Sequence, residues 1–251
     1  MKFFVQSACE QGAVRTNNED AICYGESAEL GVFWMLVADG MGGHQAGEVA
    51  SNILVDYVKE QFEQLKKIPD QPWTDWMRLQ ISQANAAIFE HAQSATQYQG
   101  MGTTGVFIVI HANQANIAWV GDSRAYLLRE HVLSLQTQDH TMIQYLLNKG
   151  AITADEAEKS NTKNLLSRAV GIKETVEVDV LTIPVEYGDT FLLSTDGLHD
   201  YLKENELADY MASFSVENTE TNKAISFNMI EQAIAQSSKD NVTLGMIKLV
   251  P

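Results

Sequence analysis

Cysteine is nearly absent from this chain, and no stretch of it stays apolar for long. The 251 residues include 2 cysteines, Cys9 and Cys23, which cannot form the disulfide framework of a small secreted domain. No apolar run approaches the roughly 18 residues of a membrane-spanning helix, and the run near the N-terminus is too short for a signal peptide. We therefore expect a soluble protein of the reducing cytoplasm, with no membrane as its partner.

Basic residues are also few. The chain has 17 Lys and Arg against 33 Asp and Glu, a formal net charge of -16. Nucleic acids and anionic membranes both require a basic face on the protein, so neither is expected as the main partner. A hydrophobic content of 45% is enough for a substantial core. Because no repeat, linker or low-complexity tract divides the chain, we expect residues 1–251 to form one domain.

Two kinds of hydrophobic periodicity alternate in blocks along the chain. Apolar residues three and four positions apart are typical of a helix with one buried face, whereas short runs rich in β-branched and aromatic residues indicate buried strands. The predicted helices are 46–65, 73–91, 139–148, 204–212 and 218–237, and the predicted strands are 3–8, 21–24, 32–38, several within 104–135, 176–183, 190–195 and 242–247. Blocks of strands and blocks of helices favour an α+β protein. We predict a four-layer α-β-β-α sandwich, in which helices flank two antiparallel β-sheets.

Aspartates recur where the predicted strands end. Three apolar runs each lead into an aspartate in a glycine-containing turn, and a fourth aspartate stands just before the last strand; these residues are Asp39, Asp122, Asp196 and Asp240. If the strands share a core, their ends can bring the four carboxylates together. Such carboxylates repel one another, and a hard divalent cation relieves the repulsion. The alternative is an ordinary turn, since Asp-Gly is a common hairpin dipeptide and Asp122 can cap its own backbone.

Oxygen ligands of this kind suit Mg²⁺ or Mn²⁺, whereas Zn²⁺ favours histidine and cysteine. The six histidines show no spacing typical of a zinc hydrolase. A site built from carboxylates points to hydrolysis at a two-metal centre, in which ions about 3.5–4 Å apart activate a water.

Eight short segments occur in a characteristic order. They are RTNNED (15–20), DGMGGH (39–44), GMGTT (100–104), GDSR (121–124), DHT (139–141), NLLSRAVG (164–171), STDGL (194–198) and DNVT (240–243). This ordered set resembles the metal-dependent protein phosphatases of the type 2C serine/threonine class, in their bacterial form. The resemblance extends over nearly the whole chain. It implies hydrolysis of phosphoserine and phosphothreonine by a metal-activated water, with two Mn²⁺ or Mg²⁺ ions and a possible third.

The resemblance also implies roles for the acidic residues. Asp39 would bridge both ions, the carbonyl of Gly40 would bind one ion, and Asp196 and Asp240 would bind the other. Asp122, together with Asp196, would hold the third ion.

The same resemblance implies roles for Glu19 and Arg15, and the role of His44 follows from its chemistry. Glu19 would hold a metal-bound water from the outer shell. Arg15 would bind the phosphoryl group, since a guanidinium offers a planar donor fork; the alternative is a salt bridge to Glu19 or Asp20. His44 would donate a proton to the leaving alcohol, or alternatively would cap the helix that follows it.

The resemblance further implies phosphorylated proteins as substrates, a cognate serine/threonine kinase as a partner in signalling, and a flap beside the site at residues 149–164. The glycines of 100–104 are interpreted as allowing close backbone packing, because no helix follows them to bind phosphate.

Two other functions remain as alternatives. One is a phosphoprotein-binding module without turnover, which the intact Asp39, Asp196 and Asp240 disfavour. The other is a cysteine-dependent phosphatase, because Cys9 to Thr16 fits the pattern C-x-x-G-x-x-R-[ST] with Arg15 as its arginine. That loop should open a helix, yet a strand is predicted after it.

Overall fold

Two antiparallel sheets lie face to face in the computed structural model, which describes residues 1–42, 46–158, 160, 165–215 and 219–251. The first sheet has the order β1 (Lys2–Glu10), β11 (Val242–Val250), β10 (Thr190–Ser194), β7 (Arg124–Arg129) and β8 (Val132–Leu135). The second has the order β2 (Asp20–Ser27), β3 (Val32–Met41), β5 (Gly105–His111), β6 (Gln114–Val120) and β9 (Asp179–Pro184), and the short β4 (Gly102–Thr103) pairs with the end of β3.

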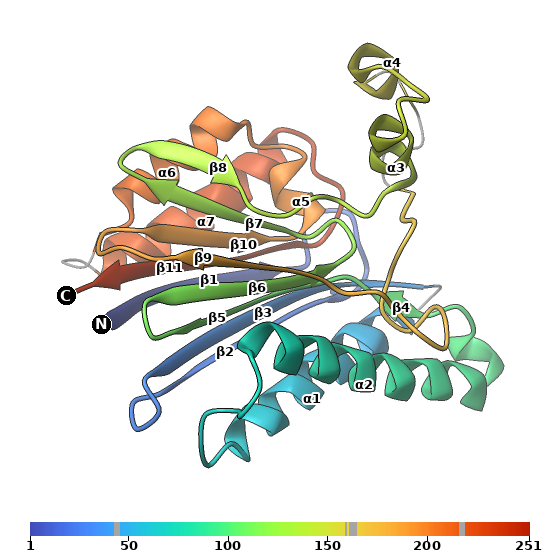
Figure 1. Ribbon diagram of the computed structural model, residues 1–251. Helices are drawn as coiled ribbons and strands as arrows, with labels where there is room; N and C mark the ends of the chain where they lie inside the picture. Colours follow the sequence, from blue (N-terminus) through green and yellow to red (C-terminus); the bar gives the residue numbers. More distant parts are fainter. Residues whose placement is uncertain (43–45, 159, 161–164, 216–218) are drawn as a thin grey trace.

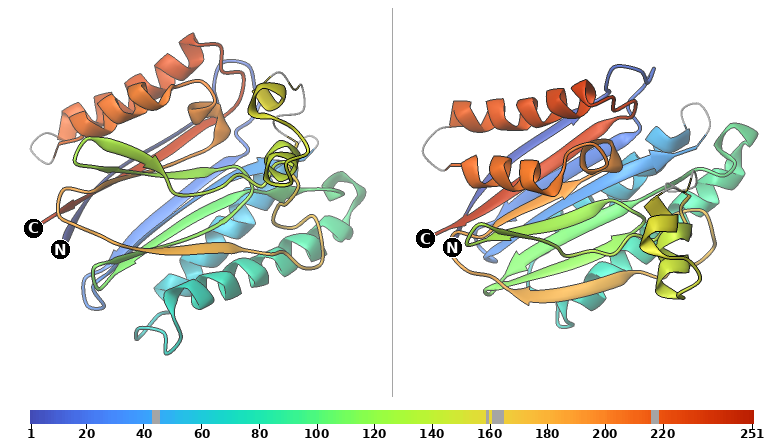
Figure 2. Two further views of the ribbon diagram at one scale, coloured as in Figure 1. Left: turned by 45° about the horizontal axis from the view of Figure 1, so that its top comes forward. Right: turned by 90° about the horizontal axis from the view of Figure 1, so that it is seen from above.

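Helices cover the outer face of each sheet (Figures 1 and 2). The helices α1 (Ala46–Glu63) and α2 (Trp73–Ser94) pack on the second sheet, while α6 (Glu204–Ser213) and α7 (Thr219–Ala235) pack on the first. The predicted four-layer α-β-β-α sandwich is thus confirmed. Within the described residues, no helix is long and apolar enough to span a membrane.

Strand β3 shows why its sequence is a continuous apolar run. Phe33, Met35 and Val37 point into the core between the two sheets, whereas Trp34 and Leu36 point to the core beneath α1 and α2. A strand buried on both faces needs apolar residues at every position, because successive side chains alternate between faces. The ring of Trp34 stacks on Phe62 of α1 with centroids 4.5 Å apart, which fixes the helix against the sheet.

Two shorter helices, α3 (Met142–Asn148) and α4 (Ala154–Glu158), stand away from the sandwich (Figure 1). Thr141 caps α3 by accepting a hydrogen bond from the Gln144 amide at its side chain. Thr141 also forms an isolated β-bridge with Leu166, so the two ends of the segment that carries α3 and α4 lie side by side. The predicted flap, 149–164, contains α4, and its residues 159 and 161–164 lie outside the described part of the chain.

Two local predictions are wrong. The turn expected at Asp196 is the start of a short helix, α5 (Asp196–His199). Strand β9 begins at Asp179 rather than at 176, because arginine side chains bind the backbone there. Arg168 donates to the Glu177 carbonyl at 3.3 Å, and Arg78 donates to the Val178 carbonyl at 3.3 Å.

Candidate active site

Asp39 lies at the end of β3, where the backbone holds it from both sides. Its amide donates to Thr104 Oγ1 at 3.0 Å, and its carbonyl accepts from the Thr104 amide at 2.8 Å and from Thr103 Oγ1 at 2.9 Å. Both threonines belong to the segment 100–104, which therefore packs closely against β3. The adjacent Gly40 is also confined, because a Cβ there would lie 2.2 Å from the Gly47 carbonyl oxygen.

Asp196 and Asp240 come together because β10 and β11 are neighbours. Asp196 follows the end of β10, and Asp240 precedes the start of β11. The Thr195 amide donates to the Thr243 carbonyl at 3.1 Å, which joins the two strand ends. A Cβ on Gly197 would lie 1.9 Å from the Asn241 carbonyl oxygen, so only glycine permits this approach.

Asp122 approaches the same region from the turn between β6 and β7. The preceding Gly121 has φ +102°, a conformation that favours glycine. Its amide donates to His140 Nδ1 at 3.1 Å, and its carbonyl accepts from the His140 amide at 2.9 Å. A cavity of about 280 Å³ is lined by Asp122 and Asp196, together with Asp139, Asp200 and Arg124. The structure therefore places Asp122 and Asp196 on one cavity.

Asp20 is an acidic residue whose place in this cluster the sequence did not indicate. It lies at the start of β2 directly opposite Asp39 in the strand register. Its buried carboxylate accepts a hydrogen bond from Thr195 Oγ1 at 2.9 Å. A polar residue at the start of a strand gives only a weak sequence signal, because most such residues face solvent.

The pKa values show how strongly these carboxylates interact. Burial, followed by the nearby charges of Asp20 and Asp196, raises the pKa of Asp39 well above its ordinary value. Burial and the charge of Asp196 raise the pKa of Asp122 to about 8. Burial is also the main cause that raises the pKa of Asp20 to about 7 and that of Asp196 to about 6. Carboxylates that resist ionisation in this way are stabilised as anions when a cation lies among them.

The donor set fits a hard divalent cation. The clustered side chains are carboxylates, the ligands that Mg²⁺ and Mn²⁺ prefer. Within the described residues, no three His, Cys, Asp or Glu side chains are arranged to enclose an ion by themselves.

Arg15 and Glu19 lie at the rim of the cluster. Arg15 Nη2 forms an ion pair with Asp240 Oδ2 at 2.7 Å, rather than with the Glu19 or Asp20 considered from sequence. Its side chain is 47% exposed and so remains accessible. Burial raises the pKa of Glu19, and a Cβ on Gly47 would lie 2.8 Å from the Glu19 side chain. His44 lies outside the described residues.

Cys9 lies in a setting that does not suit a nucleophile. It belongs to strand β1 rather than to a loop that opens a helix. Its sulfur contacts Thr243 Oγ1 at 3.1 Å and Asn18 Nδ2 at 3.2 Å, and burial raises the pKa of its thiol. A catalytic cysteine needs a lowered pKa, so this geometry disfavours the cysteine mechanism.

Sequence and structure comparisons agree with the fold. The family model described as protein phosphatase 2C matches residues 11–233. The serine/threonine phosphatase stp of Listeria monocytogenes is 35% identical over 240 residues, which cover 95% of this chain and 93% of that protein. The crystal structure of the serine/threonine phosphatase Stp1 from Staphylococcus aureus superposes with a TM-score of 0.89 and 31% identity, over 100% of this chain and 96% of that one. The catalytic domain of the phosphatase PstP, in complex with 2 manganese ions, superposes with a TM-score of 0.82 and 30% identity, over 99% of each chain.

These matches, together with the two-sheet fold, identify the class as the metal-dependent protein phosphatases. This chain belongs to the protein phosphatase 2C family. The resemblance predicted from the ordered sequence segments is thereby confirmed.

Proposed function

We propose that this protein hydrolyses phosphoserine and phosphothreonine in other proteins with the help of Mn²⁺ or Mg²⁺. The observation that carries the proposal is the convergence of Asp39, Asp122, Asp196 and Asp240 from four separate strand ends on one partly buried cluster, in which their negative charges repel one another. When bound there, two ions and a possible third would lower the pKa of water and neutralise the phosphoryl charge.

The protein's own residues would hold these ions and the substrate. Asp39 is proposed as the bridging ligand and the carbonyl of Gly40 as a ligand to one ion. Asp196 and Asp240 would bind the other ion, and Asp122 with Asp196 a third. These assignments are supported by rigid placement on strand ends, since the Asp39 backbone is fixed by three hydrogen bonds.

Arg15 is proposed to bind the phosphoryl oxygens. In the part of the chain that the structure describes, its side chain donates to Asp240 through Nη2, and a guanidinium carries five N–H donors. It can therefore remain beside the cluster while other donors bind phosphate oxygens. Glu19 would accept hydrogen bonds from water around the ions, and His44 is proposed, from sequence, as the proton donor to the leaving alcohol.

We further propose residues 1–251 as one catalytic domain, with phosphorylated regulatory proteins as substrates and a serine/threonine kinase as the opposing enzyme. A cytoplasmic location is supported by Cys9 and Cys23, which are both free thiols.

The test is phosphate release from p-nitrophenyl phosphate and from a phosphothreonine peptide, each with Mn²⁺, with Mg²⁺ and with excess EDTA. We expect turnover with the metals and none with EDTA, because the proposed ligands are hard oxygens. Asp39→Asn should abolish turnover while the protein stays folded. Peptide binding without phosphate release would instead favour a binding module, and full activity in EDTA would favour a metal-free mechanism.

A further inference from the structure

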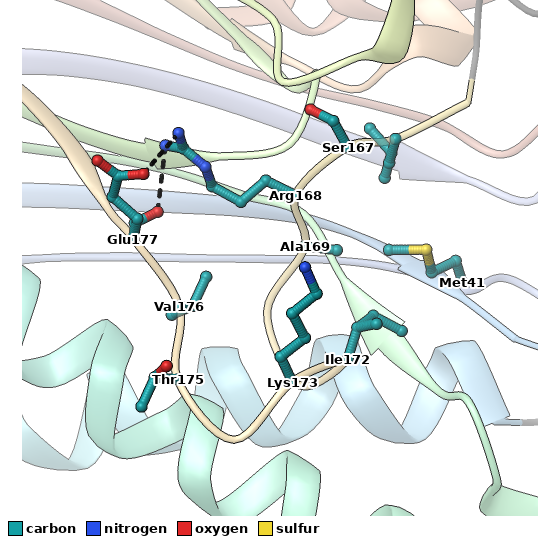
Figure 3. A pocket seen from close by; sticks show the side chains of 10 residues that line it. Met41, Ser167, Arg168, Ala169, Ile172, Lys173, Thr175, Val176 and Glu177 are labelled. Atoms are coloured by element: carbon teal, nitrogen blue, oxygen red, sulfur yellow. Dashed lines mark hydrogen bonds and ion pairs between the residues drawn. The ribbon is translucent and has the colours of Figure 1, made fainter.

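A pocket of about 520 Å³ lies beside the acidic cluster, on the loop that leads from residue 166 to β9 (Figure 3). Met41, two residues beyond Asp39 on β3, forms part of its wall. Alternate residues of a strand face the same side and advance about 3.3 Å each, so Met41 lies about 7 Å beyond Asp39 on the same face. An extended peptide spans about 3.3–3.6 Å per residue. If the phosphorylated residue of a substrate lies at Asp39, a substrate residue up to about three positions away from it would reach the pocket.

The loop that carries this pocket is rigidly attached to the sandwich. Asn85 of α2 is buried, and its side-chain amide donates to the carbonyls of Lys173 at 3.0 Å and Glu174 at 3.1 Å. Its side-chain oxygen accepts from the Gly171 amide at 2.7 Å. One asparagine thus uses both its donors and its acceptor to fix three loop residues. The pocket is a preformed feature of the fold.

The pocket floor is held against β4 in a second way. The amide of Thr103 donates to the Val170 carbonyl at 3.0 Å, and the Val170 amide donates back to Thr103 at 2.8 Å. Ile172 then lies on Gly102, where a Cβ would come within 2.7 Å of its side chain. Because Gly102 pairs with Met41, this contact sets an apolar wall directly beside the end of β3.

The two cations of the pocket differ in how they are paired. Arg168 donates to Asp179 Oδ1 at 2.7 Å and to Glu177 Oε2 at 3.0 Å, so two carboxylates neutralise it. Lys173 forms no salt bridge with any described residue. Figure 3 shows its ammonium group extending across the pocket toward Ala169, between the Val176 side and the Ile172 side. The pocket therefore offers the charge of Lys173, which no described carboxylate pairs with, between the apolar side chains of Ile172 and Val176.

We propose that this pocket binds an acidic side chain of the substrate, near the phosphorylated residue, through Lys173. An apolar side chain in the pocket would separate the ammonium from water without compensation, and a basic one would be repelled by Lys173. A glutamate matches both features, because its stem can contact Ile172 and Val176 while its carboxylate pairs with Lys173. Selectivity of this kind matters in a chain of net charge -16, which repels acidic peptides elsewhere. The inference rests on the proposed phosphatase function.

The experiment uses phosphothreonine peptides of alanine in which one glutamate is moved through the three positions on either side of the phosphothreonine. In the wild-type protein, glutamate at one or two adjacent positions should raise kcat/KM about fivefold over alanine, or about 1 kcal/mol, mainly through a lower KM. Lys173→Met keeps the unbranched apolar stem and should abolish that preference. Lys173→Glu should reverse it in favour of lysine peptides.

Lys67→Met is the matched control. It removes the same charge at a position that does not line the pocket, where Lys67 pairs with Asp70 on the surface. This control should keep the glutamate preference. Turnover of p-nitrophenyl phosphate, which has no peptide side chain, checks that each variant is folded and active.

Equal rates for all peptides in the wild-type protein would overturn the proposal, as would a preference that survives in both Lys173 variants. Hydrolysis of the alanine peptide in those cases would leave the proposed phosphatase function standing. Failure of Mn²⁺-dependent turnover on every peptide would instead contradict that function.

Discussion

In the absence of metal, the buried carboxylates make stability fall as pH rises through neutrality. Burial and the charge of Asp196 raise the pKa of Asp122 to about 8, and burial with the charge of Asp20 raises that of Asp39 well above its ordinary value. Aspartate in an unfolded chain has a pKa of about 3.9. Between these values the folded protein holds protons that the unfolded chain has lost. Raising the pH therefore lowers the free energy of unfolding.

The most informative window lies between about pH 6.5 and about pH 7.5. Burial lowers the pKa values of His140 and His199 in the folded state. Below about pH 6.5 these two histidines therefore raise the free energy of unfolding as pH rises, which opposes the effect of the aspartates. At pH 6.5 an unfolded histidine is about half protonated, and by about pH 7.5 it is nearly neutral, so this opposing contribution fades across the window. Each proton that the folded protein retains then lowers the free energy of unfolding by about 1.4 kcal/mol per pH unit. In a chain of this size, Tm falls by about 2–4 °C for each kcal/mol lost. Asp122 alone should lower Tm by about 3–6 °C, and Asp39 adds to this.

Differential scanning calorimetry in excess EDTA measures this slope directly. Asp122→Asn keeps the side-chain shape and removes the titrating group. The decrease in Tm across the window should therefore be about 3–6 °C smaller in this variant than in the wild-type protein. Asp70→Asn, at an exposed ion pair with Lys67, should leave it unchanged. Excess Mn²⁺ should reverse the trend, because ligands must lose their protons to bind metal and the gain in stability grows with pH.

A Tm in EDTA that stays level or rises between these pH values would refute the reasoning. So would an unchanged slope in Asp122→Asn, since the proton would then belong to another group. Either result would mean that the carboxylates are better solvated than their burial indicates.

The layers of the fold could be predicted because burial leaves a periodic trace in the sequence. Strand β3 is apolar at every position, which indicates two covered faces, and α1 shows a single buried stripe. The start of β9 could not be predicted in this way. From residue 176 apolar and acidic residues alternate as in a strand. However, Arg78 and Arg168 bind the carbonyls there, and those arginines lie 100 and 9 residues away from their acceptors.

The short helix α5 shows the limit of turn patterns. Asp196-Gly197 fits a hairpin turn, but the chain continues into a helical turn because Gly197 packs against the Asn241 backbone. That contact joins two segments far apart in sequence, so no local pattern reveals it.

The acidic cluster was predictable for a related reason, since each aspartate follows or precedes an apolar strand. The partners of these residues were not. Asp20 joins the cluster through the register of β2 against β3. Arg15 pairs with Asp240 across 225 residues of chain. Such contacts depend on the assembled sheets, whereas the ion pairs that the sequence offered as an alternative for Arg15 were with its nearest acids, Glu19 and Asp20.

Substitutions at three other residues test single roles. Arg15→Ala should mainly raise KM, because the guanidinium binds phosphate in both ground and transition states, and Arg15→Lys should restore little; full rescue would exclude a planar two-donor contact. Cys9→Ser should keep turnover within about threefold, since burial raises the thiol pKa, whereas inactivity of a folded variant would identify a nucleophile. His44→Gln should slow phosphoserine hydrolysis by about 10²–10⁴-fold if His44 protonates the leaving alcohol. The same variant should barely affect p-nitrophenyl phosphate, whose leaving group departs without a proton. Equal small losses on both substrates would make His44 a helix cap, while equal large losses with weakened Mn²⁺ affinity would place its effect on the metal site.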